Sequence, residues 1–374
     1  MKKQYLLALE TSCDDTSIAL MEWEESPLNY TLRYHQSFSQ EALLRTYGGV
    51  VPELAARYHV AKIFPLLREA LDKNNIQLSD LTYVASTQGP GLLGPLLTGL
   101  NTAKVISLTQ QIPLIGVNHL FAHLEAIHYT KQISYPYLGL VVSGGHTFFA
   151  LVESGTKWKF IGSTLDDAIG EALDKGGKML QLSYPAGKKM DEIFEFGNPH
   201  KYSFPIHLKL PKDQCHLSYS GIKNAIRLMI EKMNDLIVPP TQWETKEDSS
   251  QVYYDVLSSY MFSVFQILIN RIPVAIKLAK DLTGLKDIPL IIGGGVACSK
   301  QLRNLLKDFS NIHFVTPECC SDNALMVALW AIRNLDQAIP YPKSLDMDAY
   351  SRTINRSDMV FANSQKNEQS SEEK

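Results

Sequence analysis

The chain has 374 residues, 45% hydrophobic and 20% charged, which is enough for two ordinary domains or one large two-lobed unit. Its formal net charge of -3 gives no overall sign of nucleic-acid binding, so any such surface would be a local basic patch. The five cysteines include no CxxC pair, which argues against a disulfide scaffold. Acidic residues follow closely behind Met1, unlike a secretory leader, and no apolar run has the length of a membrane span. We therefore expect a soluble cytoplasmic protein.

Short apolar runs alternate with helical periodicity through the first part of the chain, which is typical of an α/β fold. The expected elements, in order, are a hairpin of strands Leu6–Glu10 and Ser17–Met21, a helix over Val60–Asp72, a strand Tyr83–Thr87, a Gly/Pro loop Gln88–Gly94, a helix Leu96–Leu108 and a strand Pro113–Val117.

A helix is expected next, and it carries His119 and His123. Residues at i and i+4 share one helix face, so both imidazoles point the same way. Two neutral imidazoles are half of a metal site that needs a further ligand. The alternative is a polar helix face whose histidines only form hydrogen bonds, and the pair alone favours neither.

A second strand–turn–strand unit spans Tyr137–Val142, Ser143–His146 and Thr147–Leu151. Thr147–Leu151 shares the pattern Thr-x-apolar-Ala-Leu with Thr16–Leu20, which indicates a duplicated two-lobed fold with a central cleft. The later elements expected are a lysine-rich insert at Lys201–Lys212, a helical stretch Val252–Leu282, a strand Pro289–Ile292 and a disordered tail at 363–374.

Three glycine-rich turns follow expected strands: Gln88–Gly94, Ser143–Gly145 and Gly293–Gly295. Because glycine has no Cβ, backbone N–H groups in such turns can approach an anion or a nucleotide closely. Neither a P-loop nor a GxGxxG motif is present. Each turn alone is more often a simple tight turn, but three in one α/β chain raise the case for ligand binding.

The segment Leu165–Lys175 has helical periodicity with a polar stripe of Asp167, Glu171, Asp174 and Lys178. A solvated face with a Glu171–Lys175 pair is the simpler interpretation. Gly170 disfavours a helix interior by about 1 kcal/mol relative to alanine. It therefore predicts close approach of a ligand or of another backbone.

Asp322 precedes an expected helix over Ala324–Leu335 and is placed to cap its N-terminus. It could instead complete a His₂-carboxylate site with positions left open for substrate. Spacing does not choose between these two roles.

Together, the motifs resemble those of the TsaD family, the tRNA N6-adenosine threonylcarbamoyltransferases of the actin-like (ASKHA, ribonuclease-H-like) superfamily. The resemblance covers nearly the whole chain. It rests on Glu10–Thr16, Tyr47–Ala55, Gly89–Leu92, Asn118–His123, Val142–Thr147, Asp166–Lys175, Ser220–Lys223 and Asp322–Asn323. Ser143–Thr147 is closest to the bacterial and mitochondrial branch. Lobe I is expected at 1–134 with a helix at 322–336 returning to it, and lobe II at 135–321.

The resemblance implies one divalent metal per subunit on His119, His123 and Asp322, described as iron in the family, with zinc compatible by ligand type. It implies substrate binding by Val141, Val142, Ser143, Gly144, Gly145, Asp174, Gly187, Asp191 and Ser299. The implied reaction transfers the threonylcarbamoyl group from threonylcarbamoyl-AMP to N6 of adenosine 37 in tRNAs reading ANN codons. Accessory proteins of the TsaB and TsaE type are the implied partners.

Two positions depart from the family pattern. Ser299 stands where the family has asparagine, and Ala186 stands where it has glycine. Serine keeps a hydroxyl but loses the amide, so donor affinity or the contact itself is expected to differ. Neither change touches the implied metal ligands.

The chemistry requires a weakly nucleophilic aromatic amine to attack a carbamoyl carbonyl, so the site must polarise that carbonyl and align both reactants. A metal with open positions would act as a Lewis acid. Asp14 and Asp15, in the turn after the first strand, are the candidates for accepting the amine proton.

Three alternatives compete with this interpretation. A metalloprotease lacks its HExxH glutamate, because Leu120 stands in that position. An actin-like ATPase or sugar kinase would explain the glycine turns but not the histidines. A nucleotide-binding scaffold would tolerate loss of His119.

Lysines gather near the implied substrate site, and others lie in the insert: Lys175, Lys178, Lys188, Lys189, Lys201, Lys209 and Lys212. They are either a tRNA-binding patch or a solvated face, and the solvated face is the commoner case. Phosphate contacts would make tRNA affinity fall steeply with salt.

Overall fold

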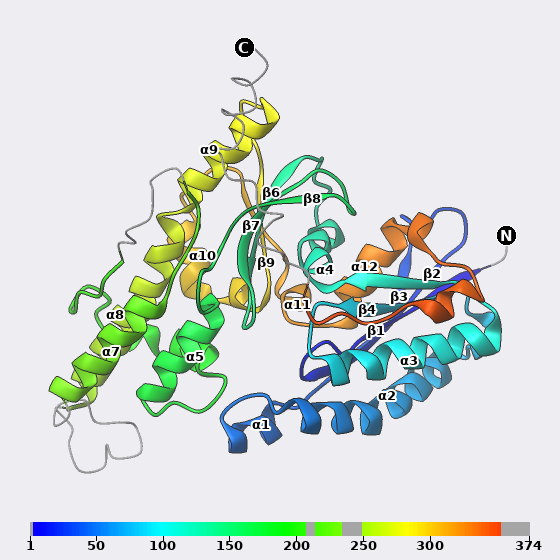
Figure 1. The fold of residues 1–374 in the computed structure, drawn as a ribbon, viewed down its shortest axis with the longest axis horizontal. Coiled ribbons are helices and arrows are strands. Elements are labelled where there is room, and N and C mark those ends of the chain that lie inside the picture. Colours follow the sequence, from blue (N-terminus) through cyan, green and yellow to red (C-terminus); the bar gives the residue numbers. More distant parts are fainter. Residues whose placement is uncertain (1–2, 207–213, 234–248, 353–374) are drawn as a thin grey trace, which may run out of the picture. The chain divides into compact units, whose positions relative to one another are not determined.

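The computed structural model describes residues 3–206, 214–233 and 249–352. The predictions for Lys209, Lys212 and the tail 363–374 lie outside these residues. The chain divides into two compact units: residues to Ile133 together with those from Val315 form unit 1, and Ser134–Phe314 lie in unit 2. Each unit contains one five-stranded sheet (Figure 1).

The sheet of unit 1 has the strand order β3-β2-β1-β4-β5. Its strands are β1 (Gln4–Glu10), β2 (Asp15–Trp23), β3 (Thr31–Ser39), β4 (Tyr83–Gly89) and β5 (Leu114–Asn118). The first three strands pair antiparallel, with Glu10 opposite Ser17, whereas β1, β4 and β5 pair parallel.

The sheet of unit 2 repeats this arrangement in the order β8-β7-β6-β9-β10. Its strands are β6 (Tyr137–Val142), β7 (Thr147–Val152), β8 (Trp158–Ser163), β9 (Leu290–Gly293) and β10 (Ile312–Phe314). The antiparallel and parallel pairings follow the same sequence as in unit 1. The segments Thr16–Leu20 and Thr147–Leu151 lie in the equivalent strands β2 and β7. The predicted duplicated α/β fold is therefore confirmed, while the cleft stays a prediction.

Helices cover both faces of the first sheet (Figure 1). The helices of this unit are α1 (Glu41–Tyr47), α2 (Pro52–Asn74), α3 (Leu93–Gln110), α4 (His119–Glu125), α11 (Pro317–Cys320) and α12 (Ala324–Arg333). Helices α2 and α3 pack on the face that carries Leu7 and Leu9, where they form a buried core with Leu100. Because side chains alternate along a strand, Ala8 and Glu10 point to the other face, which α12 covers.

Helix α2 begins at Pro52, earlier than the sequence pattern indicates, and ends before Asn75. Proline suits the first helical turn because its missing N–H would be unpaired there anyway. Asn75 has a φ of 52°, the left-handed conformation that commonly stops a helix. This longer helix brings His59 under the turn between β1 and β2.

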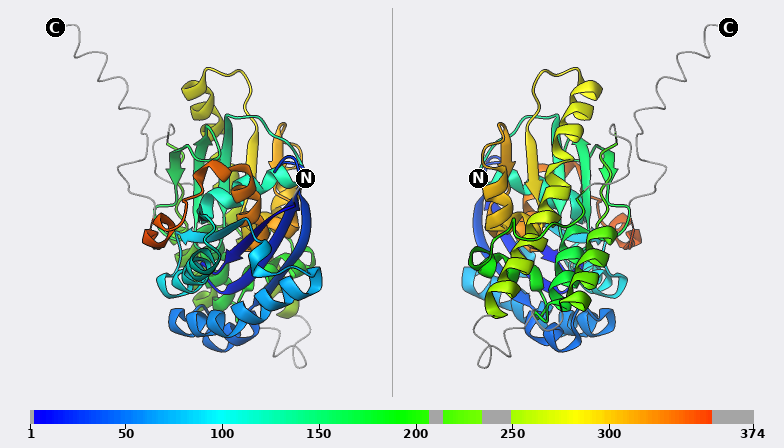
Figure 2. Two further views of the ribbon diagram at one scale, coloured as in Figure 1. Left: turned by 90° about the vertical axis from the view of Figure 1, so that its right-hand side faces the viewer. Right: turned by 90° about the vertical axis from the view of Figure 1, so that its left-hand side faces the viewer.

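Unit 2 contains a cluster of mutually contacting helices, α5, α7 and α8, seen together in the right-hand view of Figure 2. Its helices are α5 (Ile169–Met179), α6 (Ala186–Ile193), α7 (Ser220–Lys232), α8 (Ser249–Ile269), α9 (Ile272–Thr283) and α10 (Lys300–Leu306). The single helical stretch predicted over Val252–Leu282 is wrong, because two helices meet at Asn270 and Arg271. Pro273 lacks an N–H and would clash with a preceding turn, so α8 cannot continue.

The stretch Ser250–Thr283 is long and apolar enough to cross a membrane by length and composition, contrary to the sequence-based expectation. Its polar side chains nevertheless bond within unit 2: Ser258 donates to the Phe194 carbonyl at 2.6 Å, and Tyr260 donates to the Ala172 carbonyl at 2.7 Å. These bonds, with Tyr253 and Tyr260 fully buried, are typical of a core helix.

The predicted start of the helix at Leu165 is also wrong. The Leu165 N–H donates to the Leu217 carbonyl, and Asp166 accepts from the backbone N–H of Tyr219, so this segment is not helical and braces the start of α7. Helix α5 begins only at Ile169. Asp167 therefore lies before the helix rather than on its polar stripe, and it pairs with Lys175 and Lys223.

Candidate metal centre and substrate-binding turns

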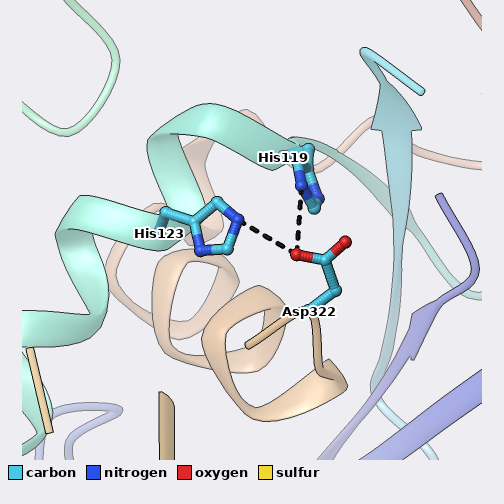
Figure 3. A group of neighbouring side chains, drawn as sticks. All are labelled: His119, His123 and Asp322. Carbon is cyan, nitrogen blue, oxygen red and sulfur yellow. Dashed lines mark ion pairs between the residues drawn. The ribbon is translucent and has the colours of Figure 1, made fainter. Parts of the chain in front are cut away.

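His119 and His123 lie one turn apart on α4, and both are buried. Asn118 caps the helix by accepting from the N–H groups of Leu120 and Phe121 at 3.0 and 3.2 Å. This cap fixes where the helix starts and hence which way both imidazoles point. The two ring centroids are 4.6 Å apart with a 79° angle between the planes. Both rings face Asp322 (Figure 3).

Asp322 comes from the opposite end of the sequence, between α11 and α12. Of the two roles left open for it, the capping of α12 is wrong, because Asn323 accepts from the Met326 N–H at 3.0 Å and is the cap. Asp322 faces the histidines: its Oδ1 lies 3.2 Å from His123 Nε2 and 3.5 Å from His119 Nε2. One donor atom from each of the three residues lies within 4.8 Å of the others.

The pKa values of the two histidines are shifted in opposite directions. Burial lowers the pKa of His123, which favours the neutral form that can bind a metal. Burial opposes protonation of His119, but the nearby carboxylates of Asp322 and Glu10 raise its pKa to about 9. Two imidazoles and one carboxylate whose donor atoms lie this close together are a set suited to a divalent transition metal. Their role as ligands remains a prediction.

The turn between β1 and β2 carries Asp14 and Asp15. Burial and the charges of Asp14 and Asp322 raise the pKa of Asp15 to about 7. Burial also raises the pKa of Asp14, and again the Asp322 charge adds to the effect. A carboxylate that titrates near neutral pH is suited to accept a proton in catalysis. The negative charge of Asp322 therefore contributes to the raised pKa of both carboxyl groups.

His59 supports this turn and was not singled out by the sequence analysis. Its Nε2–H donates to the Cys13 carbonyl at 3.1 Å, and the Thr16 hydroxyl donates to its Nδ1 at 2.8 Å. Since a carbonyl can only accept, the bond to Cys13 requires a proton on Nε2, and in the neutral ring the Thr16 hydroxyl donates to Nδ1. Burial lowers the pKa of His59 accordingly. A histidine inside an amphipathic helix gives no sequence signal for such a role.

The turn after β6 is made of bare backbone. Ser143 closes it by donating its N–H to the His146 carbonyl at 2.8 Å. Gly144 and Gly145 are exposed, and a Cβ added at either would meet no atom within 4 Å. Within the described part of the chain, no hydrogen bond engages their N–H groups. The turn therefore offers free donors to an anionic or carbonyl oxygen. Val141 and Val142 are buried in β6 and lead into it.

Gly170 lies directly against this turn. A Cβ at Gly170 would be 2.8 Å from the Ser143 carbonyl oxygen and from the Gly144 Cα. The Gly170 N–H donates to the same carbonyl at 3.2 Å. The predicted close approach at Gly170 is thus confirmed, and the approaching group is the backbone of the Ser143–Gly145 turn.

Asp174 and Asp191 bind helix N-termini. Asp174 Oδ1 accepts from the N–H groups of Ala186 and Gly187 at 2.8 and 3.2 Å, at the start of α6. Asp191 accepts from the Ser299 hydroxyl at 2.5 Å and from the Lys300 N–H at 3.0 Å, at the start of α10. Both carboxylates fix the loops that carry the other predicted substrate-binding residues. Direct substrate contact by Asp174, Gly187, Asp191 or Ser299 remains a prediction.

The two departures from the family pattern are accommodated locally. The Ala186 methyl group occupies the space that Gly177 leaves, because a Cβ at Gly177 would lie 2.2 Å from it. Ser299 caps α10 by accepting from the Leu302 N–H at 3.1 Å. Serine is among the residues that cap helices best.

The remaining glycine turns differ in accessibility. In Gln88–Gly94, a Cβ at Gly89 would clash with Tyr350, and one at Gly91 would lie 2.5 Å from the Ser12 carbonyl oxygen, so the protein itself fills the space beside these two glycines. In Gly293–Gly295, Gly294 has a φ of 98° and packs on Val142, whereas a Cβ at Gly295 would meet no atom within 4 Å. The backbone at Gly295 is therefore open to a ligand.

The lysines near these turns are partly engaged. Lys175 pairs with Glu171 at 2.7 Å, as predicted, and with Asp167 at 2.9 Å. Lys189 pairs with Glu192 at 3.1 Å. Lys178 and Lys188 are exposed. A tRNA-binding role for this group remains a prediction.

Known proteins resemble the chain along most of its length. The family model of TsaD, tRNA N6-adenosine threonylcarbamoyltransferase, matches residues 31–329. The chain belongs to the TsaD family. A relative of that name from Rickettsia bellii is 35% identical over 91% of this chain and 96% of its own length. One from Wolbachia pipientis is 36% identical over 89% of this chain and 93% of its own.

Among solved structures, full-length HypF in its phosphate- and nucleotide-bound form superposes with a TM-score of 0.51 at 11% identity. The match covers 89% of this chain and 46% of that protein. At this identity the likeness concerns the fold alone, and it agrees with the actin-like arrangement that the duplicated sheets indicate.

Proposed function

We propose that this TsaD family member is a transferase that moves the threonylcarbamoyl group from threonylcarbamoyl-AMP to N6 of adenosine 37 in tRNAs reading ANN codons. The observation that carries the proposal is the family match over most of the chain together with the buried His119, His123 and Asp322 group. The proposal places the reaction in the cytoplasm, where tRNA is modified.

In this reaction the adenosine amine attacks the carbamoyl carbon, the bond from that carbon to the phosphate oxygen breaks, and AMP leaves. The amine loses one proton, and we assign its acceptance to Asp15, with Asp14 as the neighbour that helps to raise its pKa. His59 keeps both carboxylates in place by holding the two ends of their turn.

His119, His123 and Asp322 are proposed to hold one divalent metal, iron by family resemblance or zinc by ligand type. When bound, a metal of this kind polarises a carbonyl oxygen and orients the substrate that carries it. Among the described residues the group supplies three protein donors, which would leave positions open for substrate, as in catalytic rather than structural sites.

The Ser143–Gly145 turn is proposed to hold phosphate or carbamoyl oxygens of the donor with its free N–H groups. Val141 and Val142 fix the turn from β6, and Asp174 and Asp191 fix the loops bearing Gly187 and Ser299. The exposed Lys178 and Lys188 are proposed to contact tRNA phosphates. Proteins of the TsaB and TsaE type are the proposed accessory partners.

The test combines purified protein, threonylcarbamoyl-AMP and unmodified ANN-decoding tRNA, with and without the accessory proteins, followed by mass analysis of the nucleosides. We expect threonylcarbamoyl-adenosine in the tRNA and an equal amount of AMP. Unmodified adenosine in every mixture would contradict the proposal. Modification that persists unchanged in a His119→Ala variant would favour a scaffold that only positions another enzyme.

A further inference from the structure

Glu10 is a fully buried carboxylate that the reaction described above does not use. It ends β1 and points to the same side of the sheet as α12, opposite Leu7 and Leu9. Burying a charged group is costly unless hydrogen bonds satisfy it. We therefore expect hydrogen-bond donors around the Glu10 carboxylate.

Two of these partners are clear donors. The Ser12 backbone N–H donates to Glu10 Oε1 at 2.5 Å, and the Thr87 hydroxyl donates to Oε2. The third neighbour is His119, whose Nδ1 lies 3.5 Å from the same Oε2. The Ser12 hydroxyl oxygen is 3.2 Å from this ring nitrogen as well.

His119 thus has an acidic group on each of its ring nitrogens. Glu10 faces Nδ1, and Asp322 faces Nε2. A neutral imidazole carries one proton, and a carboxylate oxygen repels a lone pair but accepts from an N–H. Glu10 therefore favours the tautomer with the proton on Nδ1. That tautomer leaves the lone pair on Nε2, the nitrogen that faces the other two members of the proposed metal site.

We infer that Glu10 is a positioning residue that fixes the tautomer and ring orientation of His119 for metal binding. The inference rests on the metal site of the proposed function. Metal-ligating histidines commonly donate their second N–H to a carboxylate, which holds the ring and increases its basicity. Here the carboxylate is supplied by the strand that leads into the turn of Asp14 and Asp15.

A Glu10→Gln substitution separates this role from simple space filling. The Ser12 backbone N–H can only donate, so the glutamine oxygen must face it. The glutamine NH₂ group then faces Thr87 and His119. The Thr87 hydroxyl can rotate to accept, but His119 can accept only by moving its proton from Nδ1 to Nε2. The variant therefore keeps the shape of the site but selects the tautomer that cannot bind metal through Nε2.

The first measurement is the affinity of the full-length metal-free protein for Co²⁺ by chelator competition. We expect Glu10→Gln to bind about 10–100-fold more weakly than the unsubstituted protein, the range for loss of such a supporting partner. Thr87→Val is the matched control, because it removes another hydrogen bond to the Glu10 carboxylate but leaves its charge. We expect this variant to change the Co²⁺ affinity by less than about tenfold. Ser12→Ala tests whether the serine hydroxyl holds the ring instead.

The second measurement needs no variant. In the zinc-loaded protein labelled with ¹⁵N-histidine, we expect a slowly exchanging, strongly downfield proton on Nδ1 of His119, assigned through its contacts to Ser12. A metal bound at Nδ1, or a proton found on Nε2, would overturn the inference. It would also be overturned if Glu10→Gln kept full Co²⁺ affinity, or if only Ser12→Ala lost it. Failure of the unsubstituted protein to bind Co²⁺, Zn²⁺ or Fe²⁺ would overturn the metal site itself and Glu10's role with it.

Discussion

The two units use equivalent turns in opposite ways. In unit 1 the turn between β1 and β2 carries two ionisable side chains, Asp14 and Asp15. The backbone of this turn is bonded by Glu10, which accepts from the Ser12 N–H, and by His59, which donates to the Cys13 carbonyl. In unit 2 the turn between β6 and β7 is Ser143–His146, whose two glycines present only backbone N–H groups. The two turns connect equivalent pairs of antiparallel strands, in sheets that have the same strand order.

The difference shows how one duplicated fold can supply two kinds of chemistry. Side chains can bind a metal and move protons, but they shield the backbone behind them. Glycines expose the backbone, which can donate hydrogen bonds to a developing negative charge without any titratable group. The experiments below ask whether unit 1 depends on particular side chains and unit 2 on the absence of side chains.

The largest effect is expected from His123→Gln in unit 1. It removes one of the three donors, so we expect loss of stoichiometric metal. Activity should fall about a thousandfold or more, because a Lewis-acidic metal contributes several kcal/mol to catalysis. Metal content and rate of tRNA modification are the measurements.

His128→Gln is the matched control for that experiment, since His128 is also buried, lies five residues along the chain, and is not part of the candidate metal group. We expect it to keep its metal. Equal metal loss in both variants would indicate a general packing defect rather than a ligand.

Gly144→Ala tests unit 2. Its added Cβ would meet no protein atom within 4 Å, so the melting temperature should not change. If the turn N–H groups contact the donor, the methyl group keeps the donor away, and kcat/KM should fall about a hundredfold, as on loss of a preorganised backbone donor. The measurements are thermal unfolding and donor-dependent kinetics.

Two glycines serve as references for this variant. Gly221→Ala adds a methyl group at an equally open position on α7. It should leave the kinetics unchanged and not lower the melting temperature, because alanine favours a helix over glycine. Gly91→Ala should lower the melting temperature, because its Cβ would lie 2.5 Å from the Ser12 carbonyl oxygen. Normal kinetics in Gly144→Ala would remove the turn from the donor site.

Asp15 gives unit 1 a pH dependence. Its pKa is raised from 3.8 to about 7, so the carboxylate becomes protonated as the pH falls through about 7. The protonated carboxyl group can no longer accept a proton. We expect kcat/KM to decrease tenfold per pH unit below that midpoint. A bound dication offsets the charge of Asp322 and places the midpoint of the metal-loaded enzyme at or below about 7.

Asp15→Asn should abolish this acidic limb and lower the plateau about 10²–10⁴-fold, the range for loss of a general base. The pH profiles of both proteins are the measurement. An unaltered acidic limb in the variant would assign the proton transfer to another group.

The smallest effects are expected at Ser299. Ser299→Ala loses the cap of α10 and should lower the free energy of unfolding by about 1 kcal/mol, measured by denaturant titration. Ser299→Asn restores the family residue, keeps the cap, and should leave stability unchanged while altering the KM for the donor. A KM that is the same in all three proteins would exclude a donor contact at this position.

Periodicity predicted most of the fold, because hairpins and amphipathic helices leave local patterns. The i, i+4 spacing likewise predicted that His119 and His123 share a face. The role of Asp322 could not be settled this way, since Asp322 and Asn323 are adjacent and both suit a helix cap. Only the backbone geometry shows that Asn323 is the cap.

Other features depend on contacts that no local pattern records. In the sequence, Glu10 is an ordinary polar residue at the end of a strand. It is buried because α4 and α12, which come from distant parts of the sequence, pack near it. The start of α5 was misplaced because Leu165 and Asp166 bond to residues more than fifty positions away. Long-range bonds override local helix propensity in such segments.

The most direct test of the account is the yield of threonylcarbamoyl-adenosine per enzyme before chelation, after chelation, and after metal is restored, with threonylcarbamoyl-AMP, unmodified tRNA and accessory proteins held constant. We expect product from the metal-loaded protein, almost none from the chelated protein, and recovery when the metal returns to His119, His123 and Asp322. Equal product with and without metal would contradict the central claim.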